Sequence, residues 1–330
     1  MNVLVTGGAG YIGSHAVKQL VEAGHNVFVI DNLCMGHRAA VHQDATFYEL
    51  DIRETEALTE ILKKNNIEVV MHFAALAVVG DSVTDPISYY DNNTLGSLSL
   101  LKAINAADIK KLVFSSTCAT YGEPEEVPIV ETCPQSPINP YGTSKLVFEF
   151  ILKDYAHANP DFAYAALRYF NVAGSAEDGT IGEDHSPESH LIPVILNTVL
   201  GKREKIIIFG TDYPTPDGTC IRDYIHVQDL ISAHITVMNA LQPGDNRFYN
   251  LGIGNGLSVK EIIDATKAVT GVDFKVEIGD RREGDPPALY ANPTKIKSEL
   301  DWSAKYTDVK PIIETAWNWF KNNPNGYNDK

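Results

Sequence analysis

Long apolar segments, paired cysteines and an excess of positive charge are all missing from this sequence of 330 residues. No apolar run approaches the roughly 20 residues that cross a bilayer, which argues against a helical membrane protein. The four cysteines, Cys34, Cys118, Cys133 and Cys220, show no Cys-x-x-Cys spacing, so neither a zinc site nor a disulfide framework is predicted. A formal net charge of −16 argues against nucleic acid or an anionic membrane as a partner, because the protein would repel both.

The start of the chain and its histidines give no sign of export or of a metal. Residues 1–6 run straight into a glycine-rich turn, with no basic segment and no cleavable apolar segment, so we expect a cytoplasmic protein. The ten histidines are scattered along the chain. His185 and His190 lie five residues apart in a predicted loop, and we interpret them as polar surface rather than as metal ligands. No metal is predicted.

Short β-branched runs alternate with longer helical patterns through the first half of the chain. The strands are apolar on both faces, as expected for a parallel sheet that helices cover on both sides. This alternation predicts an α/β fold built on a doubly wound parallel Rossmann sheet. The predicted strands are residues 3–6, 27–31, 46–50, 69–73, 112–116 and 164–169, and the predicted helices include residues 11–23, 54–65 and 86–107.

The pattern loosens after residue 171, where Gly, Asp, Pro and Ser become frequent and the elements become shorter. We therefore expect a first domain of residues 1–170 and a smaller α/β lobe of residues 171–330. With 44% hydrophobic residues, the chain can bury one large core or two modest ones. Another strand–helix–strand pattern near residues 223–254 predicts that the chain returns to the first domain there.

The first predicted strand leads into a turn with glycines at Gly7, Gly10 and Gly13, followed by an amphipathic helix. Missing side chains let a pyrophosphate approach the backbone, and the helix N-terminus supplies N–H donors. Asp31 ends the second strand, 18 residues beyond Gly13. Its carboxylate can accept hydrogen bonds from both ribose hydroxyls and repels a 2′-phosphate; the nearest basic residue is Arg38. NAD is therefore predicted over NADP, and a flavodoxin-like sheet that binds another ligand is the alternative.

Tyr141 and Lys145 lie four residues apart at a predicted helix start and so face the same way. A tyrosine that titrates near ~10 is a poor base at neutral pH. The Lys145 ammonium and an oxidised nicotinamide ring would favour the phenolate and lower that pKa. Thr117, at the end of the 112–116 strand, is the candidate that bridges a substrate oxygen and the phenolate. Ser116 as the bridge, or Thr117 as a plain strand-end cap, are the alternatives.

Over nearly all of its length the sequence resembles the UDP-glucose 4-epimerases of the extended short-chain dehydrogenase/reductase family. Several of the matching segments are shared by nucleotide-sugar enzymes in general, whereas residues 213–219 combined with residues 222–227 are more particular to the 4-epimerases. The segments that carry the resemblance are residues 5–13, 31–33, 71–75, 89–93, 139–142, 168–171, 210–214, 217–219, 222–227 and 281–285.

The resemblance implies which residues bind the two ligands. Those that would bind NAD are Gly7, Gly10, Tyr11, Ile12, Gly13, Asp31, Asn32, Leu33, Cys34, Met35, Gly36, Asp51, Ile52, Phe73, Ala74, Ala75, Ala77, Asn92, Thr117, Tyr141, Lys145 and Phe170. Those that would bind the UDP-sugar are Thr117, Tyr141, Asn171, His190, Leu191, Ile207, Phe209, Arg222, Arg282, Asp285 and Leu289.

Among the substrate residues, Arg222 and Arg282 would clamp the diphosphate and Asp285 would hold the uridine ribose. A planar guanidinium matches phosphate oxygens and offsets the negative charge of the chain. The alternative for the two arginines is a surface ion pair with Asp223 or Asp285. The domain of residues 171–330 would thus bind the nucleotide sugar, and the domain of residues 1–170 the NAD.

Three positions depart from the family pattern. Ala77 stands where a lysine is common near the cofactor, and His190 replaces a usual asparagine near the phosphates. Leu289 stands where hexose-specific bacterial members often have a tyrosine beside the sugar. The shorter leucine leaves room for a C2 acetamido group, so we expect partial tolerance of UDP-N-acetylglucosamine. The alternative is that Leu289 packs against its own lobe.

The resemblance implies an isomerase of galactose metabolism that interconverts UDP-galactose and UDP-glucose by transient oxidation at C4 with tightly bound NAD. It also suggests a homodimer through the helices of residues 86–107 and 141–157. The first alternative is a nucleotide-sugar 4,6-dehydratase or another enzyme on this scaffold, but Cys118 and Ala119 stand where dehydratases have Asp-Glu. The second is a non-catalytic NAD-sensing regulator, which would lack the Tyr141 and Lys145 pair.

Overall fold

Helices and strands alternate along the chain, which the computed structural model describes over residues 1–282 and 285–327. Glu283 and Gly284, within one of the family-like segments, lie outside the described residues. The elements of the first half are β1 (Asn2–Thr6), α1 (Tyr11–Glu22), β2 (Asn26–Asp31), η1 (Arg38–Ala40), β3 (Thr46–Glu49), α2 (Thr55–Lys64), β4 (Val69–His72), α3 (Val79–Thr84), α4 (Pro86–Tyr89), η2 (Tyr90–Leu95), α5 (Gly96–Ala106), β5 (Lys111–Thr117), η3 (Cys118–Thr120), α6 (Pro140–Ala158) and β6 (Ala163–Tyr169).

The elements of the second half are shorter and lie closer together along the chain. They are β7 (Asn171–Ala173), α7 (Leu191–Val199), β8 (Ile206–Phe209), β9 (Ile221–Arg222), β10 (Tyr224–His226), α8 (Val227–Ala240), β11 (Asn246–Leu251), β12 (Leu257–Ser258), α9 (Val259–Thr270), β13 (Val276–Gly279), β14 (Ala288–Leu289), α10 (Thr294–Leu300) and α11 (Val309–Asn322). In the described part of the chain, no helix is both long enough and apolar enough to cross a membrane.

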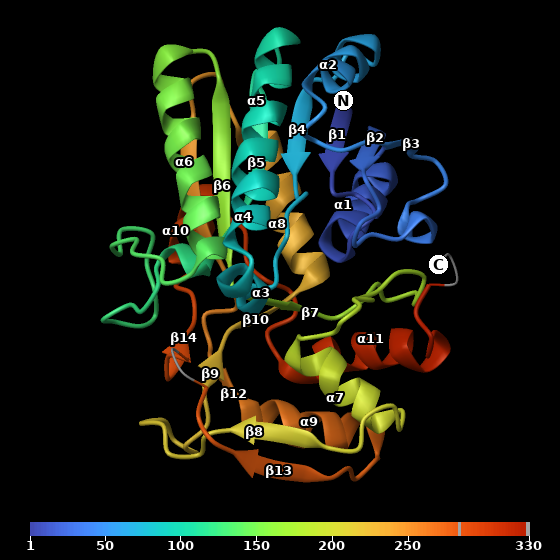
Figure 1. The fold of residues 1–330 in the computed structure, drawn as a ribbon, viewed down its shortest axis with the longest axis vertical. Helices are drawn as coiled ribbons and strands as arrows, with labels where there is room; N and C mark the ends of the chain where they lie inside the picture. Colours follow the sequence, from blue (N-terminus) through green and yellow to red (C-terminus); the bar gives the residue numbers. More distant parts are fainter. Residues whose placement is uncertain (283–284, 328–330) are drawn as a thin grey trace.

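Seven parallel strands of the described chain form the central sheet in the order β11-β6-β5-β4-β1-β2-β3 (Figure 1). The central strand β1 pairs with β2 through Thr6↔Ile30 and with β4 through Val5↔Met71. The chain first moves outward from β1 to β3 and then crosses back to β4, so the strand order reverses between β1 and β4. This arrangement confirms the predicted doubly wound Rossmann sheet.

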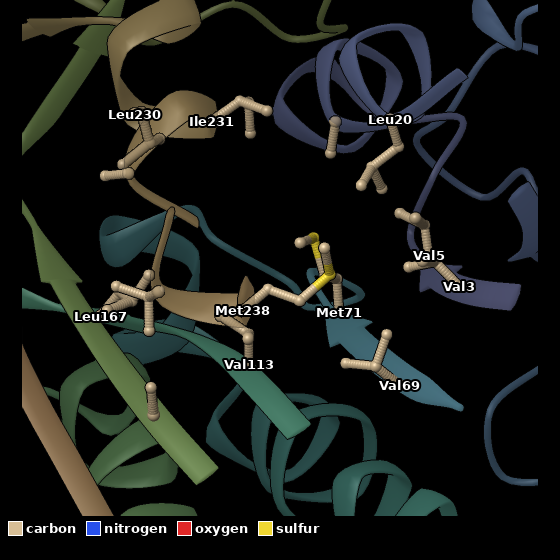
Figure 2. Close-up of a cluster of buried hydrophobic side chains, with 14 of the residues drawn as sticks. Val3, Val5, Leu20, Val69, Met71, Val113, Leu167, Leu230, Ile231 and Met238 are labelled. Carbon is tan, nitrogen blue, oxygen red and sulfur yellow. The ribbon is translucent and has the colours of Figure 1, made fainter. Parts of the chain in front are cut away.

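Consecutive residues of each strand point to opposite faces of the sheet, and each face is covered by helices. Val3 and Val5 pack in the cluster that α1 and α8 cover, whereas Leu4 belongs to the cluster under α2, α5 and α6. Figure 2 shows the first of these clusters, in which Leu20 of α1 and Met238 of α8 approach the sheet. Burial on both faces explains why the strands read as continuous apolar runs.

The smaller lobe lies beyond the carboxyl ends of the strands, in the lower part of Figure 1. There β8 pairs with β13, β9 pairs with β12 and β14, and α7, α9 and α11 share one apolar cluster. Between these segments the chain passes back through α8 to β11, which extends the large sheet by pairing with β6 from Asn246↔Tyr164 to Leu251↔Tyr169. The large sheet and the smaller lobe therefore meet at the carboxyl ends of the sheet strands.

The helix predicted over residues 86–107 is interrupted by the π-helical segment η2. The interruption places Asn93 where its side chain accepts a hydrogen bond from the Leu76 N–H at 2.8 Å and donates to the Leu76 carbonyl at 2.9 Å. Asn93 is buried, and its amide thereby satisfies the backbone of the loop after β4. This loop forms part of the site described next.

Candidate active site

A cavity of about 1120 Å³ lies at the carboxyl ends of the sheet strands and extends into the smaller lobe. Its walls include the turn after β1, the ends of β2, β4 and β5, and residues of α7, β8 and β9. Parallel α/β sheets bind ligands at this edge, beside the point where the strand order reverses. The volume lies at the upper end of the roughly 300–1,000 Å³ of small-molecule sites, and the walls come from both lobes.

The turn after β1 can accept a pyrophosphate because its glycines leave the backbone bare. Gly7 has a φ of 71°, and a Cβ there would lie 2.6 Å from the Ala74 nitrogen. A Cβ at Gly13 would lie 2.0 Å from the Gly7 carbonyl oxygen. Gly10 is the N-cap of α1 and has no side chain to occupy the helix N–H groups. The donors of this helix end are thus left for an anionic ligand, which fits the diphosphate of a dinucleotide.

Asp31 is held rigidly at the end of β2. It accepts hydrogen bonds from the Ala9 N–H at 3.0 Å and from the Leu33 N–H at 2.8 Å, and it is only 9% exposed. Burial raises the pKa of this carboxyl, while the two backbone donors act against the rise. The Arg38 guanidinium lies over the Phe47 ring at 4.6 Å. A carboxylate at this position fits an unphosphorylated ribose.

Of the predicted cofactor residues, Leu33 and Asp51 do not line the cavity, and all the others do. Leu33 adopts a left-handed φ of 57° and packs against the core beside α1. Asp51 instead accepts hydrogen bonds from the Asn32 amide at 2.8 Å and from Arg53 Nε at 2.8 Å, and the bond from Arg53 is the main cause that lowers its pKa. Asp51 thus contacts Asn32, which does line the cavity.

The catalytic candidates meet on one wall of the cavity because α6 and β5 pack together. The Asn139 side chain caps α6 by accepting from the Gly142 N–H at 2.8 Å, and Pro140 occupies the first turn. Tyr141 therefore lies in the first turn, and Lys145 follows one turn later on the same face. The Lys145 ammonium donates to the Ser115 carbonyl of β5 at 2.9 Å, and the residue is 3% exposed.

Burial pushes both groups of this pair toward their neutral forms. It raises the pKa of the Tyr141 phenol well above its usual value, against which the hydrogen bond with Thr117 acts. It lowers the pKa of Lys145 to about 7. A positively charged ring bound beside the phenol would act in the direction that a base needs, because an adjacent cation favours the phenolate.

Thr117 and Ser116 point in different directions from the end of β5. The Thr117 hydroxyl accepts from the Ala119 N–H at 3.1 Å, and the residue lines the cavity with Tyr141. Ser116 is fully buried and donates to Glu149 at 2.6 Å, away from the cavity. Thr117 is thus a strand-end cap and a cavity residue at once, and the geometry favours it over Ser116 as the bridge.

A buried ion-pair network supports this wall, and the sequence reasoning missed it. Arg168 of β6 donates to Glu149 of α6 through Nε at 3.0 Å and through Nη2 at 2.6 Å, and both residues are 3% exposed. Arg168 also donates to the Tyr121 hydroxyl at 2.8 Å. The sequence does hold one indication of this network. Glu149 follows Lys145 by four residues, as Lys145 follows Tyr141, so all three lie on one face of the helix.

All of the predicted substrate residues line the cavity, most of them from the smaller lobe. Arg222 forms an ion pair with Asp285, one of the two acidic partners proposed as an alternative, but this pair lies in the cavity wall. Asp223 is fully buried and accepts instead from the N–H groups of Ile253 and Ala291 at 2.9 and 3.1 Å. The Arg282 guanidinium lies 4.1 Å from the centre of the Phe209 ring.

The loop before α7 contributes a cluster that the sequence reasoning did not find. The sequence predicts that His185 and His190 are polar surface, and the His190 side chain is 50% exposed. Both rings, however, contact the carboxylates of Glu183 and Glu188. Burial alone would lower the pKa of the two imidazoles, but the carboxylates outweigh it and raise the pKa to about 9 for His185 and about 10 for His190.

The geometry agrees with comparisons to known proteins. Residues 3–252 match the model of the NAD dependent epimerase/dehydratase family. The chain belongs to this family. The chain is similar to a UDP-glucose 4-epimerase of Lacticaseibacillus casei. The two are 50% identical over 331 residues, which cover 100% of both chains.

Two solved structures extend the agreement to three dimensions. A crystal structure of a UDP-glucose 4-epimerase superimposes with a TM-score of 0.96 at 50% identity, covering 99% of each chain. The UDP-glucose 4-epimerase of Bifidobacterium longum, crystallised with NAD+ and UDP, gives a TM-score of 0.95 at 39% identity, covering 99% of this chain and 100% of the other. The present chain uses NAD, as the other members of its NAD dependent family do.

Proposed function

We propose that this protein is a UDP-glucose 4-epimerase, which interconverts UDP-galactose and UDP-glucose. The observation that carries the proposal is that Thr117, Tyr141 and Lys145 lie on one cavity wall next to the glycine-rich turn. Two of the relatives described above are 50% identical to this chain over 99–100% of its length, and both are named for this activity. The enzyme is thus an isomerase that depends on NAD.

The glycine-rich turn and Asp31 fit the cofactor, and the neighbouring residues would hold it. The N-terminus of α1 would bind the pyrophosphate, and the carboxylate of Asp31 would bind the adenosine ribose. When bound, NAD supplies the hydride acceptor, and afterwards the hydride donor, for C4 of the sugar. Residues 1–170 would provide most of this site, and residues 171–330 most of the site for the UDP-sugar.

Protein side chains transfer the proton of the sugar 4-hydroxyl. The Tyr141 oxygen takes the proton of the sugar 4-hydroxyl, directly or through the Thr117 hydroxyl, and returns it in the second half of the cycle. The Lys145 ammonium, anchored on the Ser115 carbonyl, stabilises the phenolate by its charge. In the second half of the cycle the opposite face of C4 must be presented, so the 4-keto sugar has to turn within the cavity.

This turn requires tight anchoring of the nucleotide and loose contact with the sugar. Arg222 and Arg282 are the cationic groups that we propose for the diphosphate, because a guanidinium offers paired donors to phosphate oxygens. Asp285, which Arg222 now holds, is proposed to contact the uridine ribose. At the sugar end, Leu289 is apolar and offers no hydrogen bond that would fix one orientation.

A dehydratase would need an acid and a base to eliminate the C6 hydroxyl. In this chain Cys118 and Ala119 follow Thr117, and burial raises the pKa of the Cys118 thiol to about 12. A thiol with that pKa is neither a base nor a ready acid at neutral pH. The wall beside Thr117 thus favours epimerisation over elimination.

The activity and its cofactor can be tested together. The purified protein, given UDP-galactose and no added nicotinamide cofactor, is expected to form UDP-glucose, because NAD must stay bound between turnovers. Denaturing the protein is expected to release NAD. Chromatography of the sugar nucleotides and of the released cofactor measures both. Accumulation of a 4-keto sugar, or release of NADP, would overturn the assignment.

Substrate breadth is expected to depend on Leu289. This residue lies in β14, pairs with Arg222 of β9 in the strand register, and lines the cavity while packing beside Ile129. We expect UDP-N-acetylglucosamine to be a substrate, with UDP-glucose and UDP-galactose still preferred. Leu289→Tyr should lower kcat/KM for the acetylated sugar by about 10–100-fold, since bulk in a tight pocket is rejected, and should change the hexose value little.

Steady-state kinetics on both substrate pairs measure this effect, with Leu289→Met as the control of similar volume. The methionine variant should keep the tolerance of the parent protein. If neither the parent protein nor Leu289→Tyr turns over the acetylated sugar, Leu289 does not control entry of the acetamido group.

We also propose a homodimer and a cytoplasmic location for this enzyme. Exposed apolar side chains gather on the segment from α3 to η2 and on α6, including Val83, Ile87, Leu95 and Phe150, which are 62%, 79%, 54% and 55% exposed. Apolar side chains this exposed favour an interface. We expect a homodimer that pairs these helices, acting in the cytoplasm on a small sugar nucleotide.

A further inference from the structure

The loop that leads into α7 places four potential metal ligands around one point. Glu183, His185 and Glu188 lie on this loop, and His190 is the N-cap residue of α7. One ligand atom from each residue can be chosen so that all four lie within 4.8 Å of one another. The spacing Glu-x-His-x-x-Glu-x-His supplies the four groups from eight consecutive residues.

The distances match a four-coordinate ion. Zinc bonds of about 2.0–2.2 Å to nitrogen and oxygen imply tetrahedral edges of about 3.4 Å. Glu183 Oε1 lies 3.3 Å from His185 Nδ1 and 2.8 Å from His190 Nδ1. Glu188 Oε2 lies 3.6 Å from His185 Nδ1, and Glu188 Oε1 lies 3.4 Å from His190 Nδ1. Three of these four distances are close to that edge, and one atom of each residue lies within 4.8 Å of the others, so the loop gathers the ligands without a complete tetrahedral arrangement.

Two of these atoms are buried without a satisfactory partner. Glu183 Oε1 and His185 Nδ1 lack a well-directed hydrogen bond within the described structure, although they lie close to each other. Glu183 is itself only 4% exposed. A buried carboxylate oxygen without a hydrogen bond is costly. Both atoms therefore remain available to a ligand that binds between the four side chains.

We propose that Glu183, His185, Glu188 and His190 bind one zinc ion. Two imidazoles and two carboxylates form a nitrogen–oxygen set that suits zinc, whereas magnesium and calcium prefer oxygen ligands alone. Zinc would displace the protons of the two imidazoles, and the remaining two carboxylates carry the charge that one divalent cation neutralises. Four protein ligands leave no open position, so the site is structural rather than catalytic.

The ion would brace a wall of the catalytic cavity. The His185 ring lies 6.3 Å from the Tyr11 ring in an edge-to-face contact, and Tyr11 is the first residue of α1. The Glu183 carbonyl accepts from Trp319 Nε1 of α11 at 3.2 Å. All four proposed ligands line the cavity. Bound zinc would therefore fix the loop of residues 183–190 between α1, α7 and α11.

Metal binding to the full-length protein tests the proposal without any substrate. After treatment with a chelator and dialysis, the protein is titrated with ZnCl₂, and elemental analysis measures the zinc retained. We expect one ion per chain and a melting temperature that rises with free zinc. The double variant His185→Asn/His190→Asn should lose the ion and the thermal shift. His42→Asn removes a histidine that faces Asp44 elsewhere, and should retain both.

Cobalt offers a second measurement, since Co²⁺ bound at four such ligands should show the visible absorption of a tetrahedral complex. His190→Asn alone alters a half-exposed ring, so it serves if the double variant fails to fold. Absence of stoichiometric zinc in the parent protein would mean that protons hold the cluster together, and would overturn the proposal. Equal zinc retention in the variants and the parent would do so too. Neither result bears on the epimerase activity, which is measured separately.

Discussion

Replacing Tyr141 by phenylalanine is expected to lower kcat for UDP-galactose by about 10²–10⁴-fold, the usual contribution of a general acid–base group. The phenolic oxygen is the group that we assign to the 4-hydroxyl proton. The ring, which lies edge-to-face with Tyr89 at 6.5 Å, contributes packing that phenylalanine retains. NAD should therefore stay bound while turnover is lost. The measurement is initial rate at saturating UDP-galactose, together with the cofactor content of the variant.

Tyr89→Phe is the matched control for this variant. The Tyr89 hydroxyl donates to the Val78 carbonyl at 2.5 Å, and the residue does not line the cavity. Its loss removes one hydrogen bond and leaves the proton pathway intact, so the rate should stay close to that of the parent protein. A Tyr141→Phe enzyme that keeps its rate within tenfold would show that another group takes the proton.

Glu149→Leu is expected to lower the free energy of unfolding by about 3–5 kcal/mol, because it leaves the buried charge of Arg168 without its partner. Glu149 accepts four hydrogen bonds, two from Arg168 and one each from Ser116 at 2.6 Å and Gln135 at 3.3 Å. These bonds join α6 to β5 and β6, the elements that carry the catalytic candidates. Urea denaturation of the parent and variant proteins measures the loss.

Two further variants separate charge burial from other causes. Glu149→Leu combined with Arg168→Met removes both charges, and should restore most of the stability lost in the single variant. Asp264→Leu removes an exposed partner of Lys260, 3.9 Å away, and should change the free energy of unfolding by about 1 kcal/mol or less. If the double variant is as unstable as Glu149→Leu, the cost arises from packing around Glu149 and not from an unpaired arginine.

The sheet was predictable because its strands carry their own signal. Val3 to Val5 and Val69 to Met71 are buried on both faces, so the apolar runs that mark them in the sequence also mark a parallel sheet. The two-face pattern assigns Val5 and Leu4 to different clusters without any knowledge of their partners. The π-helical segment was not predictable, since it depends on the contact between Asn93 and the backbone of Leu76, far from it in sequence.

Which predicted cofactor residues line the cavity depends on the direction of their side chains. Leu33 and Asp51 stand beside residues that do line the cavity, and a sequence gives no means to tell them apart. Leu33 has a left-handed φ and packs against the core, and Asp51 accepts hydrogen bonds from Arg53 and Asn32. The positions of both side chains depend on local backbone geometry and hydrogen bonding, which the identities of the neighbouring residues do not reveal.

The sequence by itself determined the sheet, the glycine-rich turn, the acidic end of β2 and the Tyr141–Lys145 pair, because each depends on contacts within a few residues or on a regular spacing. Only the tertiary structure decided which distant groups meet. It joined Arg168 to Glu149 across two elements, paired Arg222 with Asp285, and folded the loop before α7 so that Glu183 became buried among histidines. Burial and the direction of side chains arise from packing of the whole chain, and those two quantities decide which charged groups are paired and which can bind a ligand.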